Sequence, residues 1–144
     1  MIMTTRYVIL LLLVSFLLPA CNPVKNMQGR ERLTQLKAVV NNYRKMMRWG
    51  HFNEAAQYLK SSDGSEIQSD LENMSRYKVT NYTVADQITS ESQSEAKVTA
   101  YVDFYDIDTG VASSVRDEQF WWFDEEEKHW FLGSPMINFS DHVK

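Results

Sequence analysis

The sequence predicts an α+β fold: about three N-terminal helices on one face of a curved antiparallel sheet of about four strands. Apolar residues recur at helical spacing in the first half of the chain, whereas β-branched and aromatic residues dominate after residue 76. Short polar segments separate the predicted strands. Such segments fit hairpins but are too short for the crossovers of a parallel sheet. Helices followed by strands therefore indicate an α+β domain.

The first predicted helix covers residues 30–49. Its apolar stripe consists of Leu33, Leu36, Val40, Tyr43 and Met47, and Gly50 is placed to end it. Residues 52–59 predict a short second helix, and residues 67–74 predict a third helix of two to three turns. Before the first helix, residues 22–29 contain Pro23 and Gly29 and show no periodicity, which predicts an irregular tether.

Four strands are predicted, at residues 79–88, 97–107, 111–123 and 129–132. In the second of these, one apolar face is formed by Val98, Ala100, Val102 and Phe104, and we expect this face to meet the helices. Side chains alternate across a strand. Asp103, Tyr101 and Tyr105 are therefore expected on the opposite face of the sheet.

The chain opens with a charged start that includes Arg6, followed by an apolar run over residues 7–18. This layout is typical of a secretory signal, and the run is shorter than the ~20 residues of a membrane-spanning helix. It ends in Leu18-Pro19-Ala20-Cys21, which resembles the lipobox of bacterial lipoproteins. The resemblance implies cleavage between Ala20 and Cys21 and lipid attachment to Cys21. The alternative is an ordinary secretory signal with a chance cysteine.

The expected organisation is a signal peptide at 1–20, a lipidated tether at 21–30 and a single α+β domain at 31–144. Asn22 follows the lipobox, where Asp in similar lipoproteins favours the inner membrane. The resemblance thus implies a lipid-anchored envelope protein, at the periplasmic face of the outer membrane rather than the inner. Cys21 is the only cysteine. Once it is lipidated, disulfides, thiolate metal sites and cysteine nucleophiles are excluded.

Charge is distributed unevenly along the chain, whose net charge is −4. Residues 22–52 carry seven cations and one anion, whereas residues 53–144 carry seven cations and eighteen anions. Two interpretations stay open. The basic helix interacts with a partner or with anionic headgroups, or it packs beside the acidic sheet and each neutralises the other.

The segment Trp49-Gly50-His51-Phe52-Asn53-Glu54-Ala55-Ala56-Gln57-Tyr58-Leu59 and the later Lys128-His129-Trp130-Phe131-Leu132 resemble parts of the NTF2-like (cystatin-like cone) superfamily. The first is similar to its opening helix-turn-helix, and the second to the last strand of small lipoproteins assigned to it. The resemblance spans most of residues 31–135. It implies a cone between helices and sheet, and in some members an enzyme whose cone holds a carboxylate base.

No catalytic, cofactor or metal site is predicted. The sequence has no phosphate loop, metal-binding His pair or nucleophile elbow, and the turn at 124–127 lacks the alternating oxygen spacing of Ca²⁺ loops. Asp103 is weighed as a general base, but its predicted place is away from the cone. The acidic domain also argues against nucleic acid as a partner. A non-enzymatic binding or assembly module is favoured, and a small NTF2-like enzyme with a pocket in the cone is the alternative.

The aromatic run Phe120-Trp121-Trp122-Phe123 places large rings on both faces of one strand. The helices cover only one face, so one residue of the Trp121/Trp122 pair is expected on the other face, with Tyr101 and Tyr105 nearby. Exposed apolar patches mark interfaces, and many NTF2-like domains dimerise through this face. The hypothesis is a homodimer or a protein partner at the sheet. The alternative is that sheet curvature, the third helix or the tail at 134–144 covers the patch.

Overall fold

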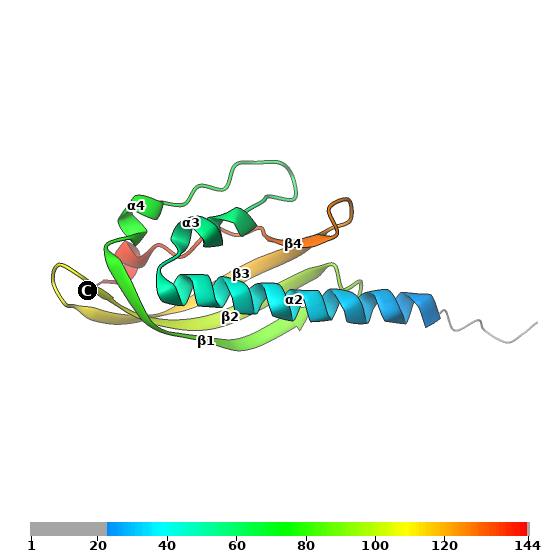
Figure 1. Ribbon diagram of the computed structural model, residues 1–144, viewed down its shortest axis with the longest axis horizontal. Coiled ribbons are helices and arrows are strands. Elements are labelled where there is room, and N and C mark those ends of the chain that lie inside the picture. Colours follow the sequence, from blue (N-terminus) through cyan, green and yellow to red (C-terminus); the bar gives the residue numbers. More distant parts are fainter. Residues whose placement is uncertain (1–22, 144) are drawn as a thin grey trace, which may run out of the picture.

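The computed structural model describes residues 23–143. Helix α2 (Pro23–Trp49) is followed by α3 (Phe52–Ala55), the 3₁₀ turn η2 (Ala56–Tyr58) and α4 (Leu71–Met74). Strands β1 (Tyr77–Thr89), β2 (Glu95–Asp106), β3 (Ala112–Asp124) and β4 (His129–Leu132) form one antiparallel sheet in that order, before the 3₁₀ turn η3 (Phe139–His142). The α+β class is confirmed (Figure 1).

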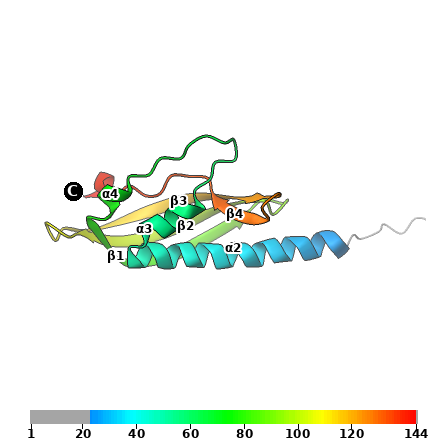
Figure 2. The same cartoon turned by 45° about the horizontal axis from the view of Figure 1, so that its top comes forward.

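Helix α2 starts earlier than the sequence predicts, because residues 23–29 are helical and not an irregular tether. A proline is tolerated in a first helical turn, where its missing N–H has no partner to lose. Gly29 allows a close approach, since a Cβ at this position would lie 1.8 Å from Oε1 of Gln93. The N-terminal part of α2 projects past the end of the sheet (Figures 1 and 2).

The predicted end of this helix at Gly50 is confirmed. Gly50 has a φ of +77°, which favours glycine. Its N–H donates to the Met47 carbonyl at 3.2 Å, and the N–H of His51 donates to the Met46 carbonyl at 2.9 Å. These paired bonds form a Schellman motif and satisfy carbonyls of the last turn. None of the helices within residues 23–143 is long and apolar enough to span a membrane.

The later helices are shorter than predicted. Residues 52–58 form α3 and the turn η2, and the third helix is reduced to the single turn α4. The side chain of Asp70 caps α4 by accepting from the N–H of Asn73 at 3.0 Å. Residues 61–69 form the irregular arch between η2 and α4 (Figure 1). Polar residues and Gly64 leave this arch without a helical apolar stripe.

The inner face of the sheet lies against the helices and carries the core. The predicted apolar face of β2 is confirmed, because Val98, Ala100, Val102 and Phe104 are all buried. From α2 the core receives Leu36, Val39, Val40, Tyr43 and Met47. The C-terminal segment adds Met136, Ile137 and Phe139, with the Phe139 ring centroid 4.7 Å from that of Phe104. The tail therefore packs on the inner face.

The two edges of the sheet differ. At β4, Leu59 forms a parallel bridge with Leu132, and the N–H of Lys60 donates to the Leu132 carbonyl at 3.1 Å. At the opposite edge, β1 pairs only with β2 and contains two register shifts, between Val79 and Asn81 and between Val84 and Asp86. The β4 edge is thus paired by the segment after η2.

Candidate functional site

A network of polar side chains is buried on the inner face of the sheet. Oδ2 of Asp117 in β3 accepts from the Tyr82 hydroxyl at 3.0 Å and from Nε2 of Gln119 at 2.6 Å. Nε2 of Gln119 also donates to the Tyr82 hydroxyl, and Oε1 of Gln119 accepts from Nε1 of Trp121 at 2.9 Å. Alternation along β3 places all three β3 residues inward.

Burial sets the electrostatics of this network. It raises the pKa of Asp117, and the hydrogen bonds from Gln119 and Tyr82 oppose that rise. Burial, followed by the nearby Asp117 charge, raises the pKa of Tyr43 and Tyr82 well above the ordinary phenol value. The Tyr43 hydroxyl is buried without a hydrogen-bond partner among the described residues. A carboxyl with a raised pKa beside a phenol is suited to proton transfer.

Aromatic side chains fill the space between the helices and the sheet around these groups. The Tyr43 ring contacts Trp121 edge-on at a centroid distance of 5.5 Å, and Tyr58 lies 5.9 Å from Trp121 and 6.4 Å from Tyr43. Asp117 and Gln119 are both buried. A substrate would therefore have to displace a core aromatic ring to reach the carboxyl, so the network acts in this conformation as packed polar core.

The predicted interface residues are divided between the two faces. Trp121 is 0% exposed and belongs to the core, so it offers no surface to a partner. Trp122 faces outward and is half-buried. On the same outer face, Tyr101 is 51% and Phe120 39% exposed, and Tyr105 is half-buried. The outer face thus presents exposed Tyr101 and Phe120 and half-buried Tyr105 and Trp122.

Polar side chains occupy the rest of that face. Asp103 accepts from Nδ2 of Asn81 at 3.2 Å and from the Ser114 hydroxyl, which joins β1, β2 and β3. These hydrogen bonds lower the pKa of Asp103, the opposite of what a general base requires. Arg116 and Glu118 form an ion pair of 2.7 Å in β3. Asp103 therefore lies on the outer face of the sheet, as the sequence predicts, and links β1, β2 and β3.

Lys60 covers the β4 end of the outer face. The Lys60 carbonyl accepts from Nε1 of Trp122 at 2.7 Å, and its ammonium lies 4.7 Å from the Phe131 ring centroid. The ammonium also pairs with Asp124 at 2.6 Å and Glu127 at 2.5 Å. Hydrogen bonding to Lys60 lowers the pKa of Asp124 to about 2. The segment after η2 is thus what covers Trp122, an arrangement the sequence does not predict.

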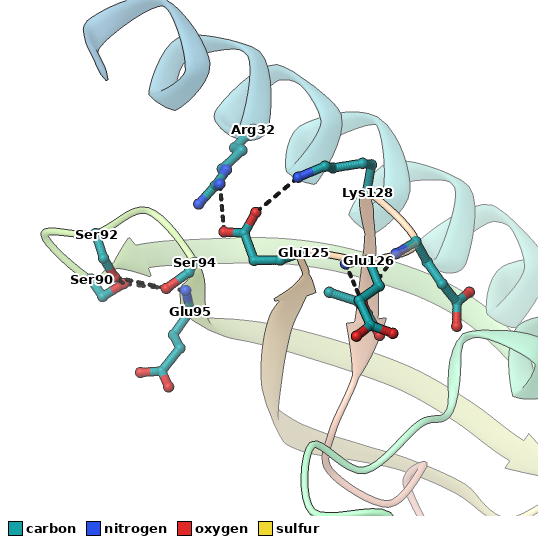
Figure 3. Close-up of polar contacts among 10 residues, drawn as sticks. Arg32, Ser90, Ser92, Ser94, Glu95, Glu125, Glu126 and Lys128 are labelled. Atoms are coloured by element: carbon teal, nitrogen blue, oxygen red, sulfur yellow. Dashed lines mark hydrogen bonds and ion pairs between the residues drawn. The ribbon is translucent and has the colours of Figure 1, made fainter. Parts of the chain in front are cut away.

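The acidic turn between β3 and β4 is neutralised mainly from α2 and from Lys60. Arg32 in α2 pairs with Glu125 at 2.5 Å, and Lys128 pairs with the same carboxylate at 3.2 Å (Figure 3). The Arg32 guanidinium also lies 4.5 Å above the Phe123 ring centroid.

No group of three His, Cys, Asp or Glu side chains suited to a metal ion occurs within residues 23–143.

Sequence reasoning missed Asp117 and Gln119. A signal is present, because Val115, Asp117, Gln119, Trp121 and Phe123 alternate along β3 and share one face. Two large apolar residues at the end of this series mark its face as the core. Two polar residues on the same face then indicate a buried network.

The lipidation and cleavage residues, Ala20 and Cys21, lie outside the described residues. Their assignment stays a prediction from the lipobox resemblance. Comparison with known protein families, curated proteins and solved structures gives no match.

Proposed function

We propose that this protein is a lipid-anchored protein of the bacterial cell envelope, with an NTF2-like domain that acts as a non-enzymatic binding or assembly module. The observation that carries the binding role is the division of the sheet into two unlike faces. Helices and the tail pack on the inner face, whereas the outer face holds Tyr101 and Phe120 at 51% and 39% exposure. Exposed aromatic side chains are favoured as interface anchors.

The filled cone supports binding over catalysis. Tyr43, Tyr58 and Trp121 pack around the buried Asp117 network, which leaves the carboxyl without contact to solvent-borne substrate. The lipid anchor and the NTF2-like assignment rest on the sequence resemblances, together with the order of helices before a curved sheet. The anchor would keep the domain at the membrane surface, within reach of envelope partners.

A photocrosslinking phenylalanine analogue at position 101 tests this role in intact cells. We expect one discrete adduct at position 101, because Tyr101 is the most exposed aromatic residue at the centre of the sheet. The same analogue at Ser62, in the arch away from the sheet, is the control and should give none. Phe120→Ser should reduce the adduct at position 101. An adduct of twice the monomer mass would identify a second copy as the partner.

The proposed interface would be wrong if the two positions crosslinked equally, or if Phe120→Ser left the adduct unchanged. Light scattering of the purified chain and its Phe120→Ser variant measures the oligomeric state as an independent test. A dimer that persists in the variant would place self-association elsewhere.

A small enzyme is the second candidate, favoured by the buried Asp117 carboxyl beside the Tyr82 hydroxyl. That role requires a conformation in which the Tyr43 ring leaves the network. Tyr43→Ala would open space beside Asp117, and binding of a small apolar probe to this variant alone would define the cone as a closed pocket.

A further inference from the structure

A groove of about 460 Å³ runs between α2 and the edge strand β1. Its floor is apolar and formed by Val40, Tyr82 and Val84. The α2 side of the groove is polar and formed by Lys37, Asn41 and Arg44, and the other side is the β1 strand at Asn81, Thr83 and Gln87. We call this site the α2–β1 groove. None of the predicted interface residues lines it, and the outer-face interface does not depend on it.

The α2 wall of the groove is cationic. Lys37, Asn41 and Arg44 follow one another at helical spacing, so the two cations lie about 10 Å apart along the helix axis. Oδ1 of Asn41 accepts from Nε of Arg44 at 3.2 Å and from Nη2 at 2.9 Å, which holds the guanidinium at the groove. Neither Lys37 nor Arg44 forms an ion pair within residues 23–143. The wall therefore suits an anionic ligand.

The β1 wall offers backbone groups. An edge strand has one side without a neighbouring strand, where N–H and carbonyl groups remain free. Arg48 reaches one of these groups, with Nη1 2.7 Å from the Val79 carbonyl. Between the two register shifts, residues 81–84 pair regularly with β2. The groove is lined by all four of these residues. A regular, unbulged stretch of edge is thus placed directly beside the two cations.

We propose that the α2–β1 groove binds an extended acidic segment of a partner protein, which adds a short strand alongside residues 81–84. Backbone hydrogen bonds to a free edge supply affinity in this mode, and side-chain contacts supply specificity. Carboxylates two residues apart on such a strand are about 7 Å apart. Flexible lysine and arginine side chains span the remaining difference, so Lys37 and Arg44 each receive one carboxylate.

The groove favours a peptide over an anionic membrane. A bilayer surface attracts exposed cations on α2 alike, including Arg30 and Lys45 outside the groove. It uses neither the apolar floor nor the backbone edge of β1. An extended chain matches the combination of an apolar floor, a guanidinium held by Asn41 and a regular four-residue edge.

The probe is a short fluorescent peptide of alternating valine and glutamate, titrated by anisotropy against the full-length chain in a neutral mild detergent. Two matched peptides carry glutamine in place of glutamate, or methylated backbone nitrogens at alternate residues. We expect the acidic peptide to bind, and both matched peptides to bind about three- to tenfold more weakly or not at all. Added salt should weaken binding of the acidic peptide.

Charge reversals on α2 supply the control. Lys37→Glu and Arg44→Glu should each lower affinity about three- to tenfold, whereas Arg30→Glu and Lys45→Glu should change it less than about twofold. Circular dichroism confirms that each variant is folded. Binding of the N-methylated peptide at full strength would overturn the proposal, as would equal losses in all four variants. Failure of the peptide to bind, with capture by phosphatidylglycerol micelles, would assign the cations to a membrane. Neither result alters the Tyr101 crosslink.

Discussion

Asp117 is a buried carboxyl surrounded by hydrogen-bond donors but by no cation. Tyr82 and Gln119 donate to it, and none of the ion pairs among residues 23–143 includes Asp117. Burial without a compensating cation disfavours the charged carboxylate and so raises the pKa of Asp117. Because the folded state binds this proton more tightly than the unfolded state, stability decreases as pH rises from the unfolded pKa through the folded one.

Asp117→Asn should therefore stabilise the protein at neutral pH. The asparagine carbonyl can still accept from Tyr82 and Gln119, but no buried charge remains. We expect the melting temperature to rise by about 3–6 °C at pH 7, on the order of 1 kcal/mol, and the difference from wild type to vanish near pH 4. Thermal melts across this pH range measure it. An equal difference at every pH would show that Asp117 does not titrate as argued.

Asp103→Asn is the matched control, because the pKa of Asp103 is lowered by Ser114 and Asn81. A lowered folded pKa stabilises the fold above the unfolded pKa, and this contribution is lost as pH falls. The Asp103 variant should thus be less stable than wild type at pH 7 and approach it in acid. The two substitutions are expected to have opposite signs.

At the scale of the element, the segment 59–60 lies along the β4 edge of the four-stranded sheet and pairs with it through one isolated bridge. Leu59 pairs with Leu132 in β4, and the Lys60 carbonyl accepts a hydrogen bond from the Trp122 indole N–H at 2.7 Å. Trp122 therefore has a structural task at the β4 edge even though it faces away from the helices. Trp121, one position earlier, packs against Tyr43 and Tyr58 on the inner face of the sheet.

Alanine substitutions at the two tryptophans should consequently have different effects on the protein. Trp121→Ala removes a fully buried ring and should cost about 3–5 kcal/mol of unfolding free energy. Trp122→Ala should cost about 1–2 kcal/mol and release the segment after η2, since a hydrogen bond and part of its burial are lost. Denaturant unfolding measures both costs, and limited proteolysis of residues 61–69 detects the release.

The Trp122→Phe variant separates the contribution of the ring to stability from that of the indole hydrogen bond. It keeps an aromatic ring against Phe131 but cannot donate to the Lys60 carbonyl, so about 0.5–1.5 kcal/mol should be lost. Cleavage of the arch at the wild-type rate in both Trp122 variants would contradict the role assigned to this residue.

Local patterns predict the strands, the end of α2 at Gly50 and the buried face of β2, because each depends on neighbouring residues. Two predictions were wrong: the start of the first helix at residue 30, and a third helix of two to three turns. Pro23 and Gly29 weaken helix propensity, yet packing of Gly29 against Gln93 supports the helix. The arch at 61–69 and the cover over Trp122 depend on contacts between residues more than sixty positions apart. Such contacts leave no local periodicity to read.

At the scale of the whole molecule, the cations of α2 are only partly neutralised by the acidic residues of the sheet. Arg32 does pair with the acidic turn through Glu125. Arg30, Lys37, Arg44 and Lys45 form no ion pair within residues 23–143. Mutual neutralisation of helix and sheet therefore accounts for one end of the helix, and the remaining cations stay available to ligands.

The proposed anchor makes a prediction for the full chain. Cys21→Ser should abolish incorporation of labelled palmitate and leave the unprocessed precursor, because lipid attachment precedes cleavage in the lipobox pathway that the sequence resembles. Several acyl chains, at ~0.8 kcal/mol per buried CH₂, would otherwise hold the protein permanently in the membrane. Metabolic labelling and membrane fractionation measure both effects. Ser15→Ala, inside the apolar run, is the control that should label normally.

The contacts that close this fold join distant parts of the chain. The Trp130 indole donates to the Arg32 carbonyl 98 positions earlier, and Leu59 pairs with Leu132. These two contacts form only once β4 has been synthesised, and such non-local closure slows folding. A nascent chain would remain open for most of its synthesis. Such a delay would suit export before folding, which the proposed lipid anchor requires.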